Sequence, residues 1–156
     1  MKIFVRQIIT LLSLILCCVN TLNAQQKNIE AIILDNSCWR VGSYEIKLTE
    51  DSIFVTKENL YETSKSYSFV MDSKDWKRIK STVQDIDLKI IDTFSSPTNQ
   101  RAVDVACYDR ITIMTKDNKE YRTQYFDGGR PMAIISTLYS QICKIYAELV
   151  SQKLID

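Results

Sequence analysis

Histidine is absent from the 156 residues of this sequence, and glycine and proline are scarce, with three and two residues. Histidine is the usual general base near neutral pH and the commonest metal ligand. Its absence excludes a Ser-His-Asp triad, a Cys-His pair and an HExxH zinc helix. The three glycines form neither a dinucleotide-binding fingerprint nor a phosphate-binding loop. We therefore expect no catalytic residue of these kinds, no metal and no cofactor.

An excess of charge of one sign is also lacking. The chain has 20 Lys and Arg against 19 Asp and Glu, a formal net charge of +1. A chain so close to neutrality has no electrostatic footprint for a nucleic-acid backbone, so we expect no nucleic-acid partner. The content of 46% hydrophobic and 25% charged residues is typical of one globular domain.

The first 24 residues have the layout of an export signal. Lys2 and Arg6 precede an apolar run from Ile8 to Val19, and a polar stretch then ends at Ala24. This run is shorter than the roughly 20 residues that a membrane-spanning helix needs. We expect cleavage after Ala24, which leaves residues 25–156 as one periplasmic or extracellular domain. Because Lys2 and Arg6 leave with the signal, the net charge becomes −1.

Two alternatives would hold the chain at a membrane through its N-terminus. The segment can stay uncleaved as an anchor, or a lipid can be attached at Cys17 or Cys18. The residues before these cysteines, 14–16, lack the small residue expected ahead of a lipidated cysteine. We therefore rank lipidation below cleavage.

Cleavage leaves three cysteines, Cys38, Cys107 and Cys143. In an oxidising compartment they allow one disulfide and one free thiol, and they can equally be small buried hydrophobes. No CxxC spacing exists, so neither a zinc knuckle nor a redox pair is indicated. The sequence does not fix which cysteines pair.

Hydrophobic periodicity predicts strands followed by a helix, then a hairpin and a second helix. Period-two alternation covers residues 29–35, 44–48, 53–56 and 67–71, with a turn at 49–51. Asp72 and Ser73 are good N-caps for a helix of about three turns with the stripe Trp76, Ile79, Val83 and Ile86. A hairpin of residues 110–115 and 120–126 follows, and Pro131 is placed to start a last helix that ends near Val150.

This order predicts an α+β fold, a two-layer sandwich in which an antiparallel sheet of about five to six strands carries two helices on one face. The opposite face of the sheet then meets either water or a partner. Candidates for that face are Phe54, Tyr121 and Tyr125.

Several motifs resemble a group of small exported bacterial α+β proteins of uncharacterised function. They are the acidic-Trp stretch at 72–76, the segment 96–101 with Asp104, and residues 126–129 before Pro131. The resemblance covers most of residues 40–150. It implies export and the same element order, and it implies no activity.

Two charged loops enter and leave the predicted second hairpin, and their residues are Arg101, Asp104, Asp109 and Arg110, then Asp127, Gly128, Gly129 and Arg130. Because the ends of a hairpin lie close together, we expect one cluster beside the N-terminus of the last helix. One interpretation is a site for a small anionic ligand or a partner protein. The other is an ion pair that holds the loops, with glycines that supply positive φ angles.

Two classes of function remain. The first is an exported, non-catalytic binding module that docks on another protein through the open sheet face and aromatic loops. The alternative is a small hydrolase that uses paired carboxylates and needs no histidine. A third possibility is a structural envelope component held by its N-terminal segment. We expect binding rather than catalysis, because binding demands less of the sequence.

Overall fold

A computed structural model describes residues 29–39, 41–59, 61–100 and 106–155 of the chain. The expected export signal, residues 1–24, lies outside these ranges. The elements in chain order are β1 (Ile29–Cys38), β2 (Gly42–Thr49), β3 (Ser52–Glu58), β4 (Lys65–Val70), α2 (Ser73–Gln84), the 3-10 helix η2 (Leu88–Thr93), β5 (Cys107–Thr115), β6 (Glu120–Arg122), β7 (Phe126–Asp127), the 3-10 helix η4 (Ala133–Ile135) and α3 (Ser136–Ser151).

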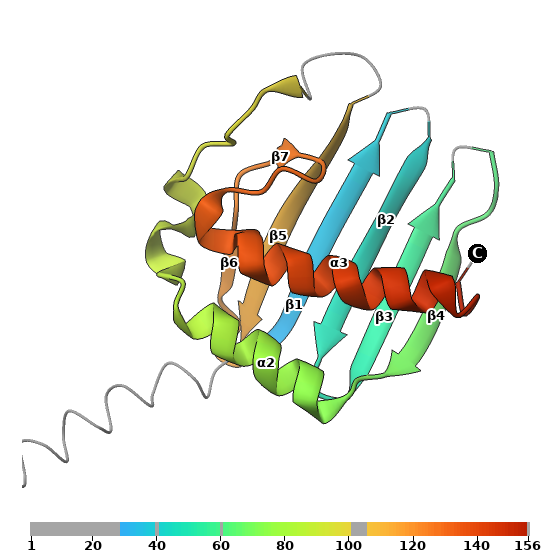
Figure 1. The fold of residues 1–156 in the computed structure, drawn as a ribbon, viewed down its shortest axis with the longest axis horizontal. Coiled ribbons are helices and arrows are strands. Elements are labelled where there is room, and N and C mark those ends of the chain that lie inside the picture. The colour runs from blue at the N-terminus through green and yellow to red at the C-terminus, as the bar shows by residue number, and fades with distance from the viewer. Residues whose placement is uncertain (1–28, 40, 60, 101–105, 156) are drawn as a thin grey trace, which may run out of the picture.

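The strands form one antiparallel sheet in the order β4-β3-β2-β1-β5-β6, and β7 pairs with β5 beside β6. Both α2 and α3 lie on the same face, and α3 crosses over the strands from β5 to β4 (Figure 1). The predicted two-layer α+β fold is confirmed. In the part of the chain that the structure describes, no helix is long and apolar enough to span a membrane.

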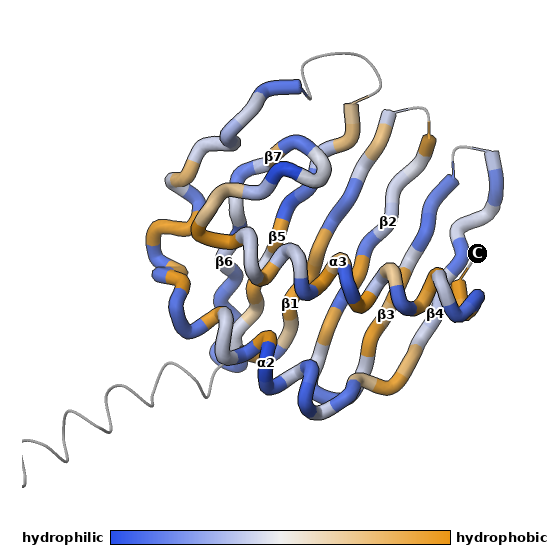
Figure 2. The backbone as a smooth tube through the Cα atoms, in the orientation of Figure 1, coloured by the Kyte–Doolittle hydropathy of each residue, from blue (hydrophilic) through white to orange (hydrophobic). Residues whose placement is uncertain are grey.

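The core lies between the sheet and the helices because apolar residues occupy every second position of the central strands. In register, Leu34 of β1 faces Ile46 of β2 on one side and Ile111 of β5 on the other. All three side chains are fully buried, and each such burial contributes about 2 kcal/mol. Apolar residues gather where the strands pass beneath α2 and α3 (Figure 2). The opposite face is the open face of the sheet.

The first helix forms where the sequence predicts it. The carboxylate of Asp72 accepts a hydrogen bond from the backbone N–H of Lys74 at 2.7 Å, which caps α2. Trp76, Ile79 and Val83 are buried against the sheet, as their spacing predicts.

The second hairpin departs from the prediction because its return strand carries a bulge. Ile111 N–H donates to the hydroxyl of Thr123 instead of a backbone carbonyl, at 3.1 Å. Before the bulge Ile113 faces Tyr121, and after it Asp109 faces Phe126, a register shift of one residue. A shift of one residue exchanges the two faces of a strand, so Phe126 is fully buried.

Because of this bulge, the residues on the open face differ from those that the sequence predicts. Tyr121 packs against the core, so its assignment to the open face is wrong. Tyr125, after the shift, lies on the open face with Phe54, and each is 42% exposed. The expected start of the last helix is also wrong. Met132 keeps an extended backbone that buries its side chain, and α3 begins only at Ser136 after the 3-10 turn η4.

Gly42 lies at a close approach between two hairpins. Its φ is +125°, and a Cβ on it would lie 2.2 Å from the carbonyl oxygen of Glu58 on β3. We expect Gly42→Ala to lower the free energy of unfolding by about 2 kcal/mol, because both the backbone angle and the contact oppose a side chain. Urea denaturation measures this loss. The control is Gly129→Ala, where φ is also positive but nothing lies within 4 Å. Equal losses in the two variants would show that the contact with Glu58 contributes nothing.

Candidate functional site

The charged cluster predicted from the sequence is only partly assembled. Arg101 and Asp104 lie outside the described residues. Asp109 and Arg110 are neighbours on β5 and therefore point to opposite faces of the sheet. Asp109 is fully buried on the helix-covered face, whereas Arg110 lies on the open face.

The carboxylate of Asp109 is the centre of a buried hydrogen-bond network. It accepts from Asn36 Nδ2 at 2.5 Å, from the hydroxyl of Tyr139 at 2.6 Å and from the backbone N–H of Gly129 at 3.2 Å. These donors come from β1, from the first turn of α3 and from the loop after β7. Asp109 therefore joins three parts of the fold near the N-terminus of α3.

Asp127 holds a second loop in the same way. Its carboxylate accepts hydrogen bonds from the hydroxyl of Thr98 and from the backbone N–H of Gln100, the latter at 2.7 Å. The next residue, Gly128, donates its N–H to Cys107 O at 2.8 Å, and a Cβ on it would lie 3.0 Å from the Cys107 Cβ. Asp127 and Gly128 thus fix chain geometry.

The remaining two residues of the predicted cluster lie at the turn after β7. Gly129 has φ +77° and Arg130 is exposed, with its backbone N–H donating to Asp127 O at 2.9 Å. The described contacts of Asp109 and Asp127 are hydrogen bonds that hold loops, and of the two glycines only Gly129 has a positive φ. Two buried carboxylates in one region also oppose the binding of an anion, because like charges repel.

Three ionisable side chains beside Asp109 are partly buried on the helix-covered face. Burial raises the pKa of Tyr139 well above its usual value, and its hydrogen bond to Asp109 adds to the effect. Burial also raises the pKa of Tyr44, which stacks on Tyr146 with ring centroids 4.6 Å apart. The pKa of the Cys143 thiol is raised for the same reason. A thiol with a raised pKa is a poor nucleophile, so Cys143 is not an activated cysteine.

The cysteine question that the sequence leaves open has a definite answer here. Cys38 at the end of β1 and Cys107 at the start of β5 face each other in the sheet and form a disulfide, and Cys143 is free. The bond ties the two central strands together at the end where the loops of the β1–β2 and β3–β4 hairpins lie (Figure 1).

Arg110 organises the open face of the sheet. Its guanidinium donates to Asp35 through Nε and a terminal nitrogen, both at 3.2 Å, and lies 4.7 Å from the ring centroid of Tyr125. The ring of Tyr108 meets Tyr125 edge to face at 5.1 Å. These residues line a shallow hollow of about 310 Å³ whose other lining residues include Glu45 and Glu58.

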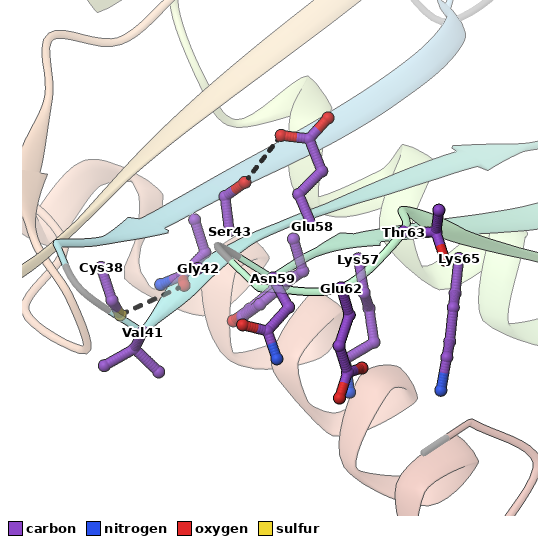
Figure 3. A pocket seen from close by; sticks show the side chains of 12 residues that line it. Cys38, Val41, Gly42, Ser43, Lys57, Glu58, Asn59, Glu62, Thr63 and Lys65 are labelled. Atoms are coloured by element: carbon purple, nitrogen blue, oxygen red, sulfur yellow. Dashed lines mark hydrogen bonds between the residues drawn. The ribbon is translucent and has the colours of Figure 1, made fainter.

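A second hollow lies at the ends of the two neighbouring hairpins. Its volume is about 520 Å³, and the residues that line it come from the β1–β2 hairpin and from the β3–β4 hairpin. In Figure 3, Lys57, Glu62 and Lys65 extend on one side of the hairpin ends, and Ser43 and Glu58 extend on the other. The hydroxyl of Ser43 donates to the Glu58 carboxylate at 3.3 Å and bridges the two hairpins.

Large apolar side chains project from these hairpin ends into solvent. Trp39 is 63% exposed, Val41 66% and Tyr61 86%. We call these three residues the hairpin-end surface. Val41 lines the 520 Å³ hollow together with Asn59 and Glu62, so the two hairpin ends adjoin. Sequence analysis did not single out these residues, although each stands in a polar segment between two predicted strands, where a buried role is not expected.

A metal centre does not form in the described ranges, where no group of three or more Cys, Asp or Glu residues is placed to hold an ion. Comparison of the chain with models of protein families, with curated protein sequences and with solved structures finds no match.

Proposed function

We propose that this chain is an exported, non-catalytic binding module that docks on another protein through the hairpin-end surface. The observation that carries the proposal is the exposure of Trp39, Val41 and Tyr61 on adjoining hairpins. Isolated exposed hydrophobics are ordinary, but a group of them beside a hollow is typical of an interaction site. Tryptophan and tyrosine are also the residues that most often dominate binding energies.

The neighbouring open face extends this surface with polar and aromatic groups. Trp39 and Tyr108 line one further hollow, which links the hairpin ends to the edge-to-face pair of Tyr108 and Tyr125. Arg110, held by Asp35, adds a fixed guanidinium at the rim. An aromatic centre with a polar rim is the common anatomy of a protein interface.

Export is part of the proposal and has independent support from the disulfide. Disulfides persist in periplasmic and extracellular compartments and are rare in the cytosol. The bond between Cys38 and Cys107 therefore agrees with the signal layout of residues 1–24.

The binding proposal is tested with photocrosslinking in bacterial cells that express the full chain. A photoreactive phenylalanine at position 39 or 61 should give an adduct with one discrete partner protein. The matched control is Ile90, which is 41% exposed on η2 and remote in sequence from the hairpin ends. With the partner in hand, Trp39→Ser and Tyr61→Ser should each weaken binding by about 30-fold, the effect of losing about 2 kcal/mol. Equal adducts from all three positions, or none, would contradict the proposal.

A second candidate function, hydrolysis by paired carboxylates, is favoured by one observation. Asp35 and Glu45 face each other directly on β1 and β2, and both line the 310 Å³ hollow of the open face. Facing side chains place their carboxyl groups within the range of about 5–10 Å used by glycoside hydrolases. Turnover of a panel of chromogenic glycosides that is lost in Glu45→Gln would support this candidate. Equal turnover in that variant would reject it.

A further inference from the structure

The two edge strands of the sheet differ in how well they are protected against pairing with another chain. The edge strand β6 has only three residues, two of them charged, and short charged edges resist pairing with other chains. The edge strand at the other end, β4, has six residues, and no charge, proline or bulge interrupts it after Lys65. Among the described residues, no strand pairs with its outer edge. Such an edge is a template for another strand.

Backbone hydrogen bonds show which groups of β4 face outward. The N–H of Met71 donates to the carbonyl of Asp51 at 3.0 Å, directly after the paired residues Val70 and Ser52. In an antiparallel pair the bonded residues alternate, so residues 65, 67 and 69 bond to β3. The N–H and C=O groups of Ser66, Ser68 and Val70 therefore point away from the sheet.

These three outward-facing residues are symmetric about Ser68. An antiparallel copy of β4 centred there places Ser68 opposite Ser68, and Ser66 opposite Val70 in both directions. In this register every outward N–H and C=O group of the three residues forms a hydrogen bond with the second copy. On the other face of the strand it places Tyr67 opposite Phe69, an aromatic pair that stabilises strand pairing. Lys65 then faces Met71, so no like charges meet.

Exposed apolar side chains gather at this same end of the sheet. Val70 is 86% exposed, and its neighbour Phe54 lies on the same face. The C-terminal part of α3 lies over β4 (Figure 1) and carries the exposed Val150, and the exposed Leu154 follows the end of the helix. A partner strand on β4 would cover surface that water now contacts.

We propose that the chain forms a two-fold dimer in which β4 pairs with β4 of a second copy and the two sheets become continuous. The partner is a second copy because the outward backbone groups and the aromatic residues of β4 are complementary to themselves, and no like charges meet in this register. A two-fold interface requires such self-complementarity. The hairpin-end surface takes no part in this pairing, so the dimer is independent of the proposed function.

The first test measures the mass in solution of protein purified from cells that express the full chain. Light scattering after size-exclusion chromatography should give the mass of two chains. Ser68→Pro should give one chain with unchanged circular dichroism, because proline removes only an outward N–H and inserts a ring at the two-fold axis. The control is Ser81→Lys, because Ser81 is exposed on α2 and distant in sequence from β4. That variant should remain dimeric.

The second test maps the register with single cysteines in a Cys143→Ser background. Ser68→Cys should be joined to its own copy by a short bis-thiosulfonate reagent, because facing side chains are about 5 Å apart. Ser66→Cys is the matched control on the same strand and face. In the proposed register its two copies lie about 14 Å apart and should not be joined. A one-chain mass for the unmodified sequence, or equal crosslinking at positions 66 and 68, would overturn the proposal.

Discussion

We expect the variant Cys38→Ala/Cys107→Ala to lose about 4 kcal/mol of unfolding free energy, which lowers the melting temperature by about 15 °C. The two cysteines are 69 residues apart in the sequence, so the bond closes a long loop. In the chain-entropy account, a crosslink restricts the unfolded chain more strongly as this loop grows. Removing it therefore stabilises the unfolded state while the folded state keeps its packing.

Thermal and urea denaturation of the oxidised protein measure the loss. The control is Cys143→Ala, which removes a free and only partly buried thiol and should cost at most about 1 kcal/mol. Intact mass after denaturation and alkylation should show one alkylated thiol in the mature chain, if residues 1–24 are removed. A disulfide variant that loses no more than the Cys143 variant would show that the bond does not constrain the unfolded chain.

Much of the fold follows from local sequence signals. Period-two alternation over residues 29–35 and 44–48 corresponds to β1 and β2, and the Asp72 N-cap with the stripe from Trp76 to Val83 corresponds to α2. These features depend on neighbours within one or two turns of chain, which is the range that sequence patterns report. The order of elements and the two-layer architecture follow from them.

The sequence-based predictions fail where contacts between residues distant in the sequence determine the structure. The bulge after β6 depends on the hydroxyl of Thr123 reaching Ile111 N–H across the hairpin, which no local pattern reveals. It moves Phe126 into the core, and in the bulged strand Tyr121 and Tyr125 then lie on opposite faces. The disulfide partners are likewise 69 residues apart and meet only once β1 pairs with β5.

The candidate site illustrates the same limit. Sequence proximity suggested one cluster around the second hairpin, but strand alternation separates Asp109 from Arg110 by the thickness of the sheet. The hairpin-end surface joins Val41 to Tyr61 through two hairpins that adjoin only in the folded sheet. The sequence signal for this surface is Trp39, a tryptophan in a polar turn. It becomes informative only when the structure shows that its side chain is exposed.

The second large effect is expected at Asp109. We predict that Asp109→Ala lowers the free energy of unfolding by about 3 kcal/mol, because Asn36 and Tyr139 both lose their common acceptor in a buried position. Urea denaturation measures the change. The control is Asp92→Ala on η2, where the side chain is exposed and the expected change is within about 0.5 kcal/mol.

A double-mutant cycle identifies the cause of that loss. Tyr139→Phe alone should cost about 1 kcal/mol, since it removes the hydrogen bond to Asp109 and one of the two acceptors of the Gly129 N–H, whose other acceptor is Asp109. In the Asp109→Ala background the same substitution should cost less than it does alone, because the phenol hydroxyl already lacks its acceptor there and only accepts from the Gly129 N–H. Additive losses would mean that the two side chains act separately. Coupling would show that Asp109 stabilises the fold in part through its hydrogen bond with Tyr139, which joins β5 to the first turn of α3.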